Sequence, residues 1–411
     1  MPRVLFWCWT EPETTSGSPV ILCDLANHLP KGCAEIFCEA RFGHGPRREI
    51  KLHHPIRRFR WHNRLWPFSR GSRVRSFWSR LLFPWLVLCG IIRVWRFKPT
   101  HIITIYIQPH WILSAYLVAR LTRTPLIYYV HDAFRENNES LGRVSRAFSR
   151  WLERVSLTQS QVWVLHSKLA DRYLQRYGVR SSVLRQMIRQ QPLPSSKRVI
   201  SNRDHATIGF SGAIYGNNRL QLEQLVGIVT ADPRLSLRIW TDPTAEGFRK
   251  LQVSSDRIEA RYESNYLLLL EQLNQCDLLY LPLSFTDCDG LTANALQYAF
   301  PTKSLDYLLV DVEILVHCPS HFELAEFFAN NRCGQVLNDG DTASLRCWID
   351  SWMRGDVVPP ERRRRLQAIE LFSEPENRRR FFQLLDDAQA THEQRTAIHH
   401  SKYVAVSADD P

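Results

Sequence analysis

The sequence predicts an α/β protein of two domains, each built on a parallel β-sheet with helices on both faces. Three observations support this prediction. Short apolar runs alternate with helical patterns along the chain, and the alternation restarts after a polar segment near its middle. A chain of 411 residues is too long for one compact core, and its 44% of hydrophobic residues can fill two interiors.

The first half contains four predicted strands, which are short apolar runs at residues 4–9, 101–107, 126–130 and 161–165. Helical patterns lie between them, at residues 19–29, 111–121, 143–157 and 168–177. Strictly alternating strands and helices favour parallel sheets, because each strand must return to the same edge through a helix.

The second half repeats this pattern. Strands are predicted at residues 206–211, 235–240, 257–262, 278–283, 314–317 and 334–337. Helices are predicted at residues 220–229, 266–273 and 321–329. We therefore expect a second domain of the same kind as the first.

Composition marks the domain boundaries. Residues 1–190 form the first predicted domain, and residues 191–204 form a linker because they are rich in proline and serine and have no apolar periodicity. The second domain is predicted at residues 205–372, and a last helix at residues 373–389. Residues 390–411 are polar, and we expect them to be a disordered tail.

Positive charge is concentrated in residues 41–100. This segment holds fifteen Lys or Arg residues and one acid, Glu49, so its charge is +14 against +12 for the whole chain. Aromatic residues are interleaved with the arginines, and the apolar run at residues 81–92 is too short to span a bilayer, which takes about 20 residues. The segment therefore predicts contact with an anionic membrane surface.

Two other interpretations of the basic segment stay open. Arginine and aromatic side chains also suit nucleic acid, but no segment matches a nucleic-acid-binding module, so nucleic acid is not the favoured partner. Alternatively, residues 81–92 are a buried helix of the first domain and the arginines are merely solvated.

The ten cysteines lack Cys-x-x-Cys spacing, which argues against a zinc site or a disulfide framework and favours a reducing compartment. The chain opens directly on a predicted strand rather than on a signal peptide. Both features predict a cytoplasmic protein.

The most informative motif is Pro301-Thr302-Lys303-Ser304-Leu305-Asp306-Tyr307, which lies between the predicted strands 278–283 and 314–317. Pro301 suits the first turn of a helix, whose free amides can face an anion. Lys303 and Asp306 share one helical face, where the first suits a phosphate and the second a pair of ribose hydroxyls. The simpler interpretation is an ordinary surface ion pair at the start of a helix.

Three further segments follow predicted strands. His131 and Asp132 end the run Tyr128-Tyr129-Val130, at the sheet edge where open α/β proteins bind ligands. A histidine there can bind a hydroxyl, or it can be a buried structural residue beside a helix-capping Asp132. The turns around Gly17 and around Gly212, in Gly209-Phe210-Ser211-Gly212-Ala213-Ile214-Tyr215-Gly216-Asn217-Asn218-Arg219, can present amides to a phosphate.

These motifs resemble the family-4 glycosyltransferases of GT-B fold, in particular the branch with a Pro-Ser/Thr-Lys-x-x-Glu/Asp-Tyr motif. The resemblance implies two Rossmann-like domains whose sheets face a central cleft, with the last helix crossing back to the first domain. It implies that Asp306 holds the ribose of the donor nucleotide and that His131 faces the donor sugar. The residues implied in catalysis are His131 and Lys303, and those implied in donor binding are Gly17, Gly212, Tyr215, Arg219, Thr302, Lys303 and Asp306.

The sequence departs from the wider family at three places. The Arg and Lys that usually neutralise the diphosphate align with Ala213 and Asn218, and the first acid of the family's Glu-x7-Glu pair aligns with Tyr298. Lys303, Arg219 and helix N-terminal amides must then offset the phosphate charge.

The resemblance implies transfer of a sugar from a nucleotide-sugar to a glycan or lipid-linked acceptor, with retention of anomeric configuration. No Asp-x-Asp motif with further ligands is evident, so we expect neither a metal nor another cofactor. A basic aromatic first domain suits a peripheral enzyme on the inner face of the plasma membrane, in bacterial surface polysaccharide biosynthesis. Two alternatives remain, a nucleotide-sugar epimerase and a degenerate protein that binds a sugar nucleotide or a partner without turnover.

Overall fold

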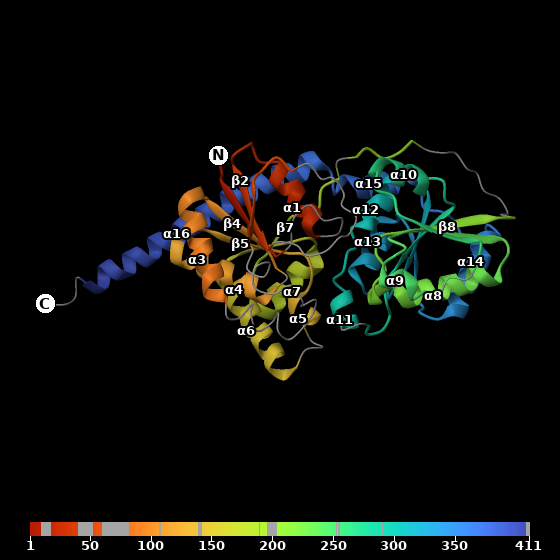
Figure 1. The fold of residues 1–411 in the computed structure, drawn as a ribbon, viewed down its shortest axis with the longest axis horizontal. Coiled ribbons are helices and arrows are strands. Elements are labelled where there is room, and N and C mark those ends of the chain that lie inside the picture. Colours follow the sequence, from red (N-terminus) through yellow and green to blue (C-terminus); the bar gives the residue numbers. More distant parts are fainter. Residues whose placement is uncertain are drawn as a thin grey trace. The chain divides into compact units, whose positions relative to one another are not determined.

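The computed structural model describes residues 1–9, 18–39, 52–59, 82–106, 108–138, 142–188, 190–194, 204–251, 253, 255–288 and 291–407 (Figure 1). Side chains are described as far as residue 394, except at residues 19 and 20. The chain forms two compact units. Unit 1 comprises Met1–Phe134, Ala147–Met187 and Pro375–Pro411, and unit 2 comprises Arg135–Arg146 and Ile188–Glu374. Unit 1 ends its main segment at Met187, three residues before the predicted domain end at residue 190.

Unit 1 contains a parallel sheet of seven strands in the order β3-β2-β1-β4-β5-β6-β7. The strands are β1 (Val4–Cys8), β2 (Ala34–Glu39), β3 (Ile56–Phe59), β4 (His101–Ile105), β5 (Leu126–Val130), β6 (Gln161–Val164) and β7 (Ser182–Val183). Every residue of β1, β2, β4 and β5 is buried, as expected for parallel strands covered on both faces. Its helices are α1 (Ser18–Asn27), α3 (Phe83–Phe97), α4 (Pro109–Thr122), α6 (Arg143–Gln159) and α7 (Ser167–Tyr177). The first four residues of α6, and α5 (Phe134–Asn137) beyond Phe134, belong to the segment Arg135–Arg146 of unit 2.

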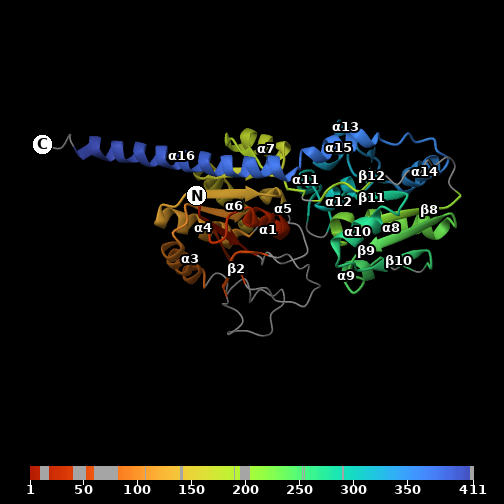
Figure 2. The same cartoon turned by 90° about the horizontal axis from the view of Figure 1, so that it is seen from above.

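Unit 2 contains a parallel sheet of six strands in the order β10-β9-β8-β11-β12-β13. Its strands are β8 (Ala206–Ser211), β9 (Leu235–Trp240), β10 (Ile258–Arg261), β11 (Leu278–Pro282), β12 (Glu313–His317) and β13 (Gln335–Leu337). Its helices are α8 (Gly216–Ala231), α9 (Glu246–Arg249), α10 (Tyr266–Leu273), α11 (Ala293–Leu296), α12 (Lys303–Leu309), α13 (Glu323–Asn331), α14 (Thr342–Met353) and α15 (Arg362–Glu370). Figures 1 and 2 show the helices of each unit on both faces of its sheet.

The predicted fold class is confirmed. All six strands predicted in the second half are present, each within one residue at either end. In unit 1 the four predicted strands are present, but the sequence does not predict β2, β3 or β7. Strand β2 contains Glu35 and Glu39, which give it a polar sequence although both are buried. Arg57 and Arg93 pair with Glu35 at 3.4 and 3.3 Å, so tertiary partners make this strand compatible with burial.

Residues 83–97 form a helix, which extends five residues beyond the apolar run that ends at residue 92. Helix α3 has Pro84 in its first turn and continues through Arg93 to Phe97. It packs beside α4, and the two helices lie together in both views (Figures 1 and 2). Gly90 allows the close approach, because a Cβ at this position would lie 2.4 Å from the ring of Trp7 and 2.7 Å from Val118. Residues 40–51 and 60–81 of the basic segment lie outside the described residues.

The C-terminal helix α16 (Glu374–Ser407) belongs to unit 1 beyond its first residue. Phe381, Leu384, Leu385 and Ala388 lie in the hydrophobic core of that unit. His101 Nε2 lies 3.0 Å from the carbonyl oxygen of Leu385. The expected disordered tail from residue 390 is wrong as far as Ser407, where the helix ends. The physical reason is that this stretch contains no proline or glycine and can extend a helix already anchored in the core.

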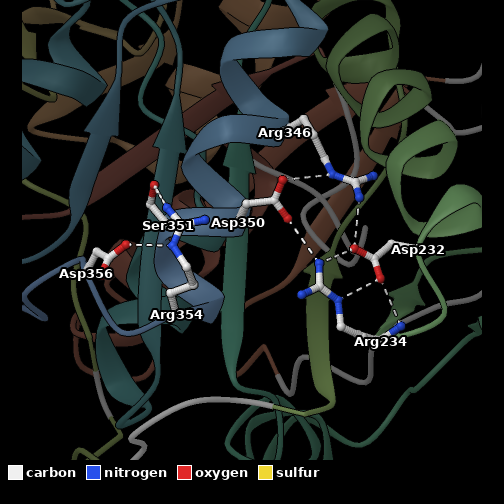
Figure 3. Close-up of polar contacts among 7 residues, drawn as sticks. All are labelled: Asp232, Arg234, Arg346, Asp350, Ser351, Arg354 and Asp356. Atoms are coloured by element: carbon white, nitrogen blue, oxygen red, sulfur yellow. Dashed lines mark hydrogen bonds and ion pairs between the residues drawn. The ribbon is translucent and has the colours of Figure 1, made fainter.

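An ion-pair network lies at the amino ends of the strands of unit 2, which is the end of the sheet opposite to their carboxyl ends (Figure 3). Asp232, which follows α8, accepts hydrogen bonds from the Arg234 guanidinium at 2.7 and 3.0 Å and pairs with Arg346 of α14 at 3.0 Å. These bonds hold the pKa of Asp232 down to about 2. Asp350 pairs with the same two arginines, so α8, β9 and α14 are joined at the amino end of the sheet. The carboxyl ends of the strands, where open α/β sheets bind ligands, lie at the other end of the sheet.

Replacing Gly90 by alanine should lower the stability of unit 1. The added methyl group collides with two buried side chains, and such overpacking typically costs about 1–3 kcal/mol. This exceeds the gain in helix propensity of about 1 kcal/mol. Thermal unfolding measures the difference. Gly227 of α8 is the matched control, because a Cβ there meets nothing within 4 Å, and Gly227→Ala should be neutral or stabilising. A Gly90→Ala protein as stable as wild type would contradict the packing described here.

Candidate functional site

The order of strands in unit 2 reverses between β8 and β11. In open α/β sheets, ligands bind at the carboxyl ends of the two strands that flank such a reversal. Gly212 follows β8, and Lys303 begins helix α12, which connects β11 to β12. Gly212 has a φ of +104°, a conformation that favours glycine. A Cβ at Gly212 would lie 3.6 Å from Lys303 Cδ. The fold therefore brings together two residues that are ninety-one positions apart in the sequence.

Lys303 is a buried amine without a counter-ion in the described part of the chain. Its Nζ is inaccessible to solvent and has no hydrogen-bond partner there, although part of its stem is exposed. The ammonium lies 3.8 Å from the centre of the Phe210 ring, a cation–π contact. Burial lowers the pKa of Lys303 to about 7. The surface ion pair considered from the sequence is not formed between Lys303 and Asp306, and the site has the properties expected where an anion binds.

Tyr307 fixes the loop that contains Gly212. Its hydroxyl accepts a hydrogen bond from the Ser211 amide at 2.8 Å and donates one to the Tyr280 carbonyl at 3.4 Å. These partners lie on β8 and β11, the two strands of the reversal. Tyr307 is fully buried, and burial raises its pKa, so its hydroxyl remains a donor. The tyrosine that closes the sequence motif is therefore a positioning residue.

Asp306 is oriented by a residue that the sequence analysis does not identify. The hydroxyl of Tyr266, the first residue of α10, donates a 2.7 Å hydrogen bond to Asp306 Oδ1. Phe210 is likewise absent from the predicted site. No sequence signal distinguishes a strand phenylalanine beneath a lysine from one that only fills the core. Tyr266 has a weak signal, because it is a residue with a hydroxyl group at the start of an apolar run.

The loop from Gly212 to Arg219 is organised by Asn218. The amide of Tyr215 donates to Asn218 Oδ1 at 3.1 Å, and Asn218 Nδ2 donates to the Ala213 carbonyl at 3.2 Å. Asn218, the third residue of α8, therefore forms a capping box with the N-cap residue Tyr215 and holds the loop, at the position where the resemblance places a lysine. Tyr215 is exposed just before the helix, and Arg219 pairs with Glu223 at 3.4 Å.

Thr302 lies immediately before α12, and its side chain makes no capping hydrogen bond. The amides of Ser304 and Leu305 donate to the carbonyls of Pro301 and Thr302 at 2.9 and 3.1 Å. Two of the amides expected to face an anion are thus already used within the turn. Positive charge at this point comes from the Lys303 side chain.

His131 follows β5 in unit 1 and is 4% exposed. Its Nδ1 lies 2.7 Å from Ser18 Oγ, at the start of α1, so the orienting partner is Ser18 rather than Asp132. Its ring stands edge-on to Tyr129, with centroids 4.4 Å apart. Burial lowers the pKa of His131 to about 3, so the imidazole is neutral, and its Nε2 has no partner within the described residues. Gly17 lies outside the described residues.

Two positions bear on the expected chemistry. Tyr298, where the wider family has its first acid, is 5% exposed, so a core side chain occupies this position. Within the described ranges, no cluster of three or more histidine, cysteine or acidic side chains is placed to hold a metal ion. Asp289 of the Asp287-Cys288-Asp289 loop lies outside those ranges.

No protein-family model and no curated protein sequence matches the chain. Several solved structures do. A sucrose-phosphate synthase from Thermosynechococcus elongatus is 13% identical, with a TM-score of 0.64 over 95% of this chain and 100% of that one. HepE from Anabaena in complex with UDP-glucose is 12% identical, with a TM-score of 0.63 over 94% and 100% of the two chains.

The lipopolysaccharide outer core galactosyltransferase WaaB is 13% identical, with a TM-score of 0.60 over 94% of this chain and 99% of that one. At such identities the likeness shows the fold. The two parallel-sheet units of this chain have the GT-B architecture of these glycosyltransferases, which confirms the predicted fold.

Replacing Lys303 by methionine should stabilise the protein at neutral pH. Lysine has a pKa of about 10.4 in an unfolded chain, so folding disfavours its charged form once the pKa falls to about 7. The gain should be absent above about pH 10, grow as the pH falls, and be complete below about pH 7. We expect about 1–3 kcal/mol from thermal unfolding at pH 7.

Lys250→Met is the matched control for this measurement. Lys250 is half-exposed and pairs with Glu246 at 2.7 Å, so its loss should change stability by no more than about 0.5 kcal/mol. A Lys303→Met protein that is less stable than wild type at every pH would show that the amine is compensated in the folded state.

Proposed function

We propose that the protein is a glycosyltransferase that moves a sugar from a nucleotide-sugar donor to a glycan or lipid-linked acceptor. The observation that carries this proposal is the group at the strand reversal of unit 2. A glycine loop, a buried amine without a counter-ion among the described residues and an oriented carboxylate lie there together in residues Gly212, Lys303 and Asp306. This is the set of groups that a nucleoside diphosphate requires.

Each part of the donor has a proposed partner. The diphosphate lies against Lys303 and the Gly212 loop, at the amino end of α8, where the helix dipole favours an anion. Asp306, held by Tyr266, binds the ribose hydroxyls. Thr302, Tyr215 and Arg219 border this site and complete the donor-binding set. The complexes of HepE with UDP-glucose and with UDP support a nucleotide-sugar as the kind of donor.

Lys303 also has the proposed catalytic role. Negative charge builds on the diphosphate as the bond to the sugar breaks, and a cation in a desolvated site stabilises that charge strongly. An amine with a pKa of about 7 is only partly charged in the free protein, and the bound diphosphate raises its pKa so that it becomes fully protonated. The positive charge of Lys303 is thus complete only when the diphosphate is bound.

His131 has the proposed role of binding a sugar or acceptor hydroxyl through Nε2. The imidazole is neutral, and its contact with Ser18 fixes the ring, so Nε2 is held ready for a hydrogen bond. Transfer requires the donor held by unit 2 and the acceptor bound by unit 1 to come within reaction distance, which in this class of fold is a matter of domain closure.

The sugar is a hexose transferred with retention, without a metal ion, because Lys303 supplies the charge that a metal would otherwise supply. The acceptor belongs to bacterial surface polysaccharide biosynthesis, and the enzyme works in the cytoplasm at the inner face of the plasma membrane. The likeness to WaaB, a lipopolysaccharide galactosyltransferase, is consistent with this choice.

A second candidate is a protein that binds a sugar nucleotide without turnover. The specific observation in its favour is that Asn218 and Tyr298, at positions where the family has functional charges, serve the loop and the core instead. Release of nucleoside diphosphate separates the two proposals, since only a transferase produces it.

One nucleoside diphosphate among UDP, GDP, ADP, CDP and TDP should raise the thermal midpoint of the wild-type protein in the presence of EDTA. A ligand at 100 times its dissociation constant stabilises the fold by about 2.7 kcal/mol. The double variant Lys303→Ala with Asp306→Ala should lose the shift. If no nucleotide shifts the wild type, the donor site is refuted, and a shift that needs added metal refutes metal independence.

His131→Ala should lower kcat by about 10²-fold or more while leaving the dissociation constant of the nucleotide little changed. The reason is that His131 acts on the reacting sugar and Lys303 binds the diphosphate. Release of nucleoside diphosphate in single-turnover experiments is the measurement. Ser18→Ala, which removes only the orienting contact, should lose less activity. Unchanged turnover in His131→Ala would exclude the proposed role.

A further inference from the structure

Helix α3 has an apolar outer face that no described residue covers. Trp85, Leu88, Ile92 and Trp95 are 53%, 45%, 36% and 68% exposed, respectively. Their spacing of three and four residues places them on a single stripe along the helix. Large exposed side chains occur singly on most proteins, whereas a continuous apolar stripe marks a surface that binds something.

The opposite face of α3 fixes which side is exposed. Leu86, Gly90, Val94 and Phe97 are buried, and Gly90 lies directly against Trp7 of β1. Rotation of the helix to hide its tryptophans would replace Gly90 by a residue with a Cβ, and a Cβ at this place lies 2.4 Å from Trp7. The outward stripe is therefore a fixed feature of unit 1.

The surroundings of the stripe are strongly basic. Arg96 and Lys98 are exposed at its carboxyl end, while Arg93 is committed to Glu35 at 3.3 Å. Residues 41–82, which lead into α3, contribute twelve of the fifteen basic residues of the segment and its single acid. The aromatic stripe is thus joined in the chain to a dense positive charge.

We propose that the outer face of α3, formed by Trp85, Leu88, Ile92 and Trp95, is the surface by which this protein docks on an anionic lipid membrane. A helix of 15 residues is about 22 Å long, which suits a helix lying in the plane of the interface. No described helix is long and apolar enough to cross a bilayer. The tryptophans enter the headgroup boundary, and the basic residues meet the lipid phosphates.

Charge selects a membrane over a second copy of the chain. Two copies that met through α3 would bring together two segments of residues 41–100, each with a net charge of +14. An anionic lipid surface has the complementary charge. The surface places unit 1 where a lipid-linked molecule is available, but the proposal stands independently of the reaction.

The test is co-sedimentation of the full chain with vesicles of phosphatidylcholine alone and of phosphatidylcholine mixed with phosphatidylglycerol. We expect the wild type to bind the mixed vesicles and to be released by salt. The variant Trp85→Ser with Trp95→Ser should bind them about tenfold more weakly or worse. Because both side chains are exposed, its thermal midpoint should equal that of the wild type.

Helix α6 offers a matched control. Phe148 and Trp151 are 40% and 50% exposed and stack with centroids 5.7 Å apart, so Phe148→Ser with Trp151→Ser removes similar aromatic area elsewhere. This variant should bind vesicles like the wild type. The proposal is overturned if the wild type ignores anionic vesicles, if it binds neutral vesicles equally well, or if the α3 variant keeps its affinity. It is also overturned if sedimentation shows a wild-type dimer that the α3 variant dissociates.

Discussion

The hydroxyl of Tyr307 joins the two strands between which the sheet of unit 2 reverses its order, and the candidate site depends on this contact. By bonding the Ser211 amide on β8 and the Tyr280 carbonyl on β11, it sets where the chain leaves β8. Gly212 can then turn with a positive φ directly beside the stem of Lys303. Without this connection the glycine loop and the lysine would be separate surface features. With it, they lie together at the place where we propose that an anion binds.

The groups proposed to bind ligands lower the stability of the fold. A buried amine above a phenylalanine ring costs free energy, because its ammonium form loses hydration and gains only a cation–π contact in return. The His131 imidazole is similar, since one ring nitrogen is bound by Ser18 and the other is buried without a described partner. The buried carboxylate of Asp232, by contrast, is paired with two arginines (Figure 3). Two of the buried polar atoms without a described partner, Lys303 Nζ and His131 Nε2, thus belong to residues for which we propose a role in binding the substrates.

In helix α3, a buried contact determines which side chains are exposed. Its inner face is set by the contact between Gly90 and Trp7, and this contact decides which of its aromatic residues face solvent. The buried-helix interpretation of the sequence describes its inner face, and the interfacial interpretation is our proposal for its outer face. A helix buried on one face and apolar on the other is suited to joining a folded domain to a second apolar phase.

The sequence by itself determined the fold class, the six strands of unit 2 and the motif from Pro301 to Tyr307, because apolar periodicity and turn chemistry are local properties. It did not determine β2, whose glutamates become compatible with burial through tertiary partners that include Arg57, Arg93 and Trp111. Nor did it identify Phe210, Tyr266 or Ser18, which matter only because folding places them against Lys303, Asp306 and His131. Those pairings join residues that are distant along the chain, and only tertiary structure decides which side chain meets which.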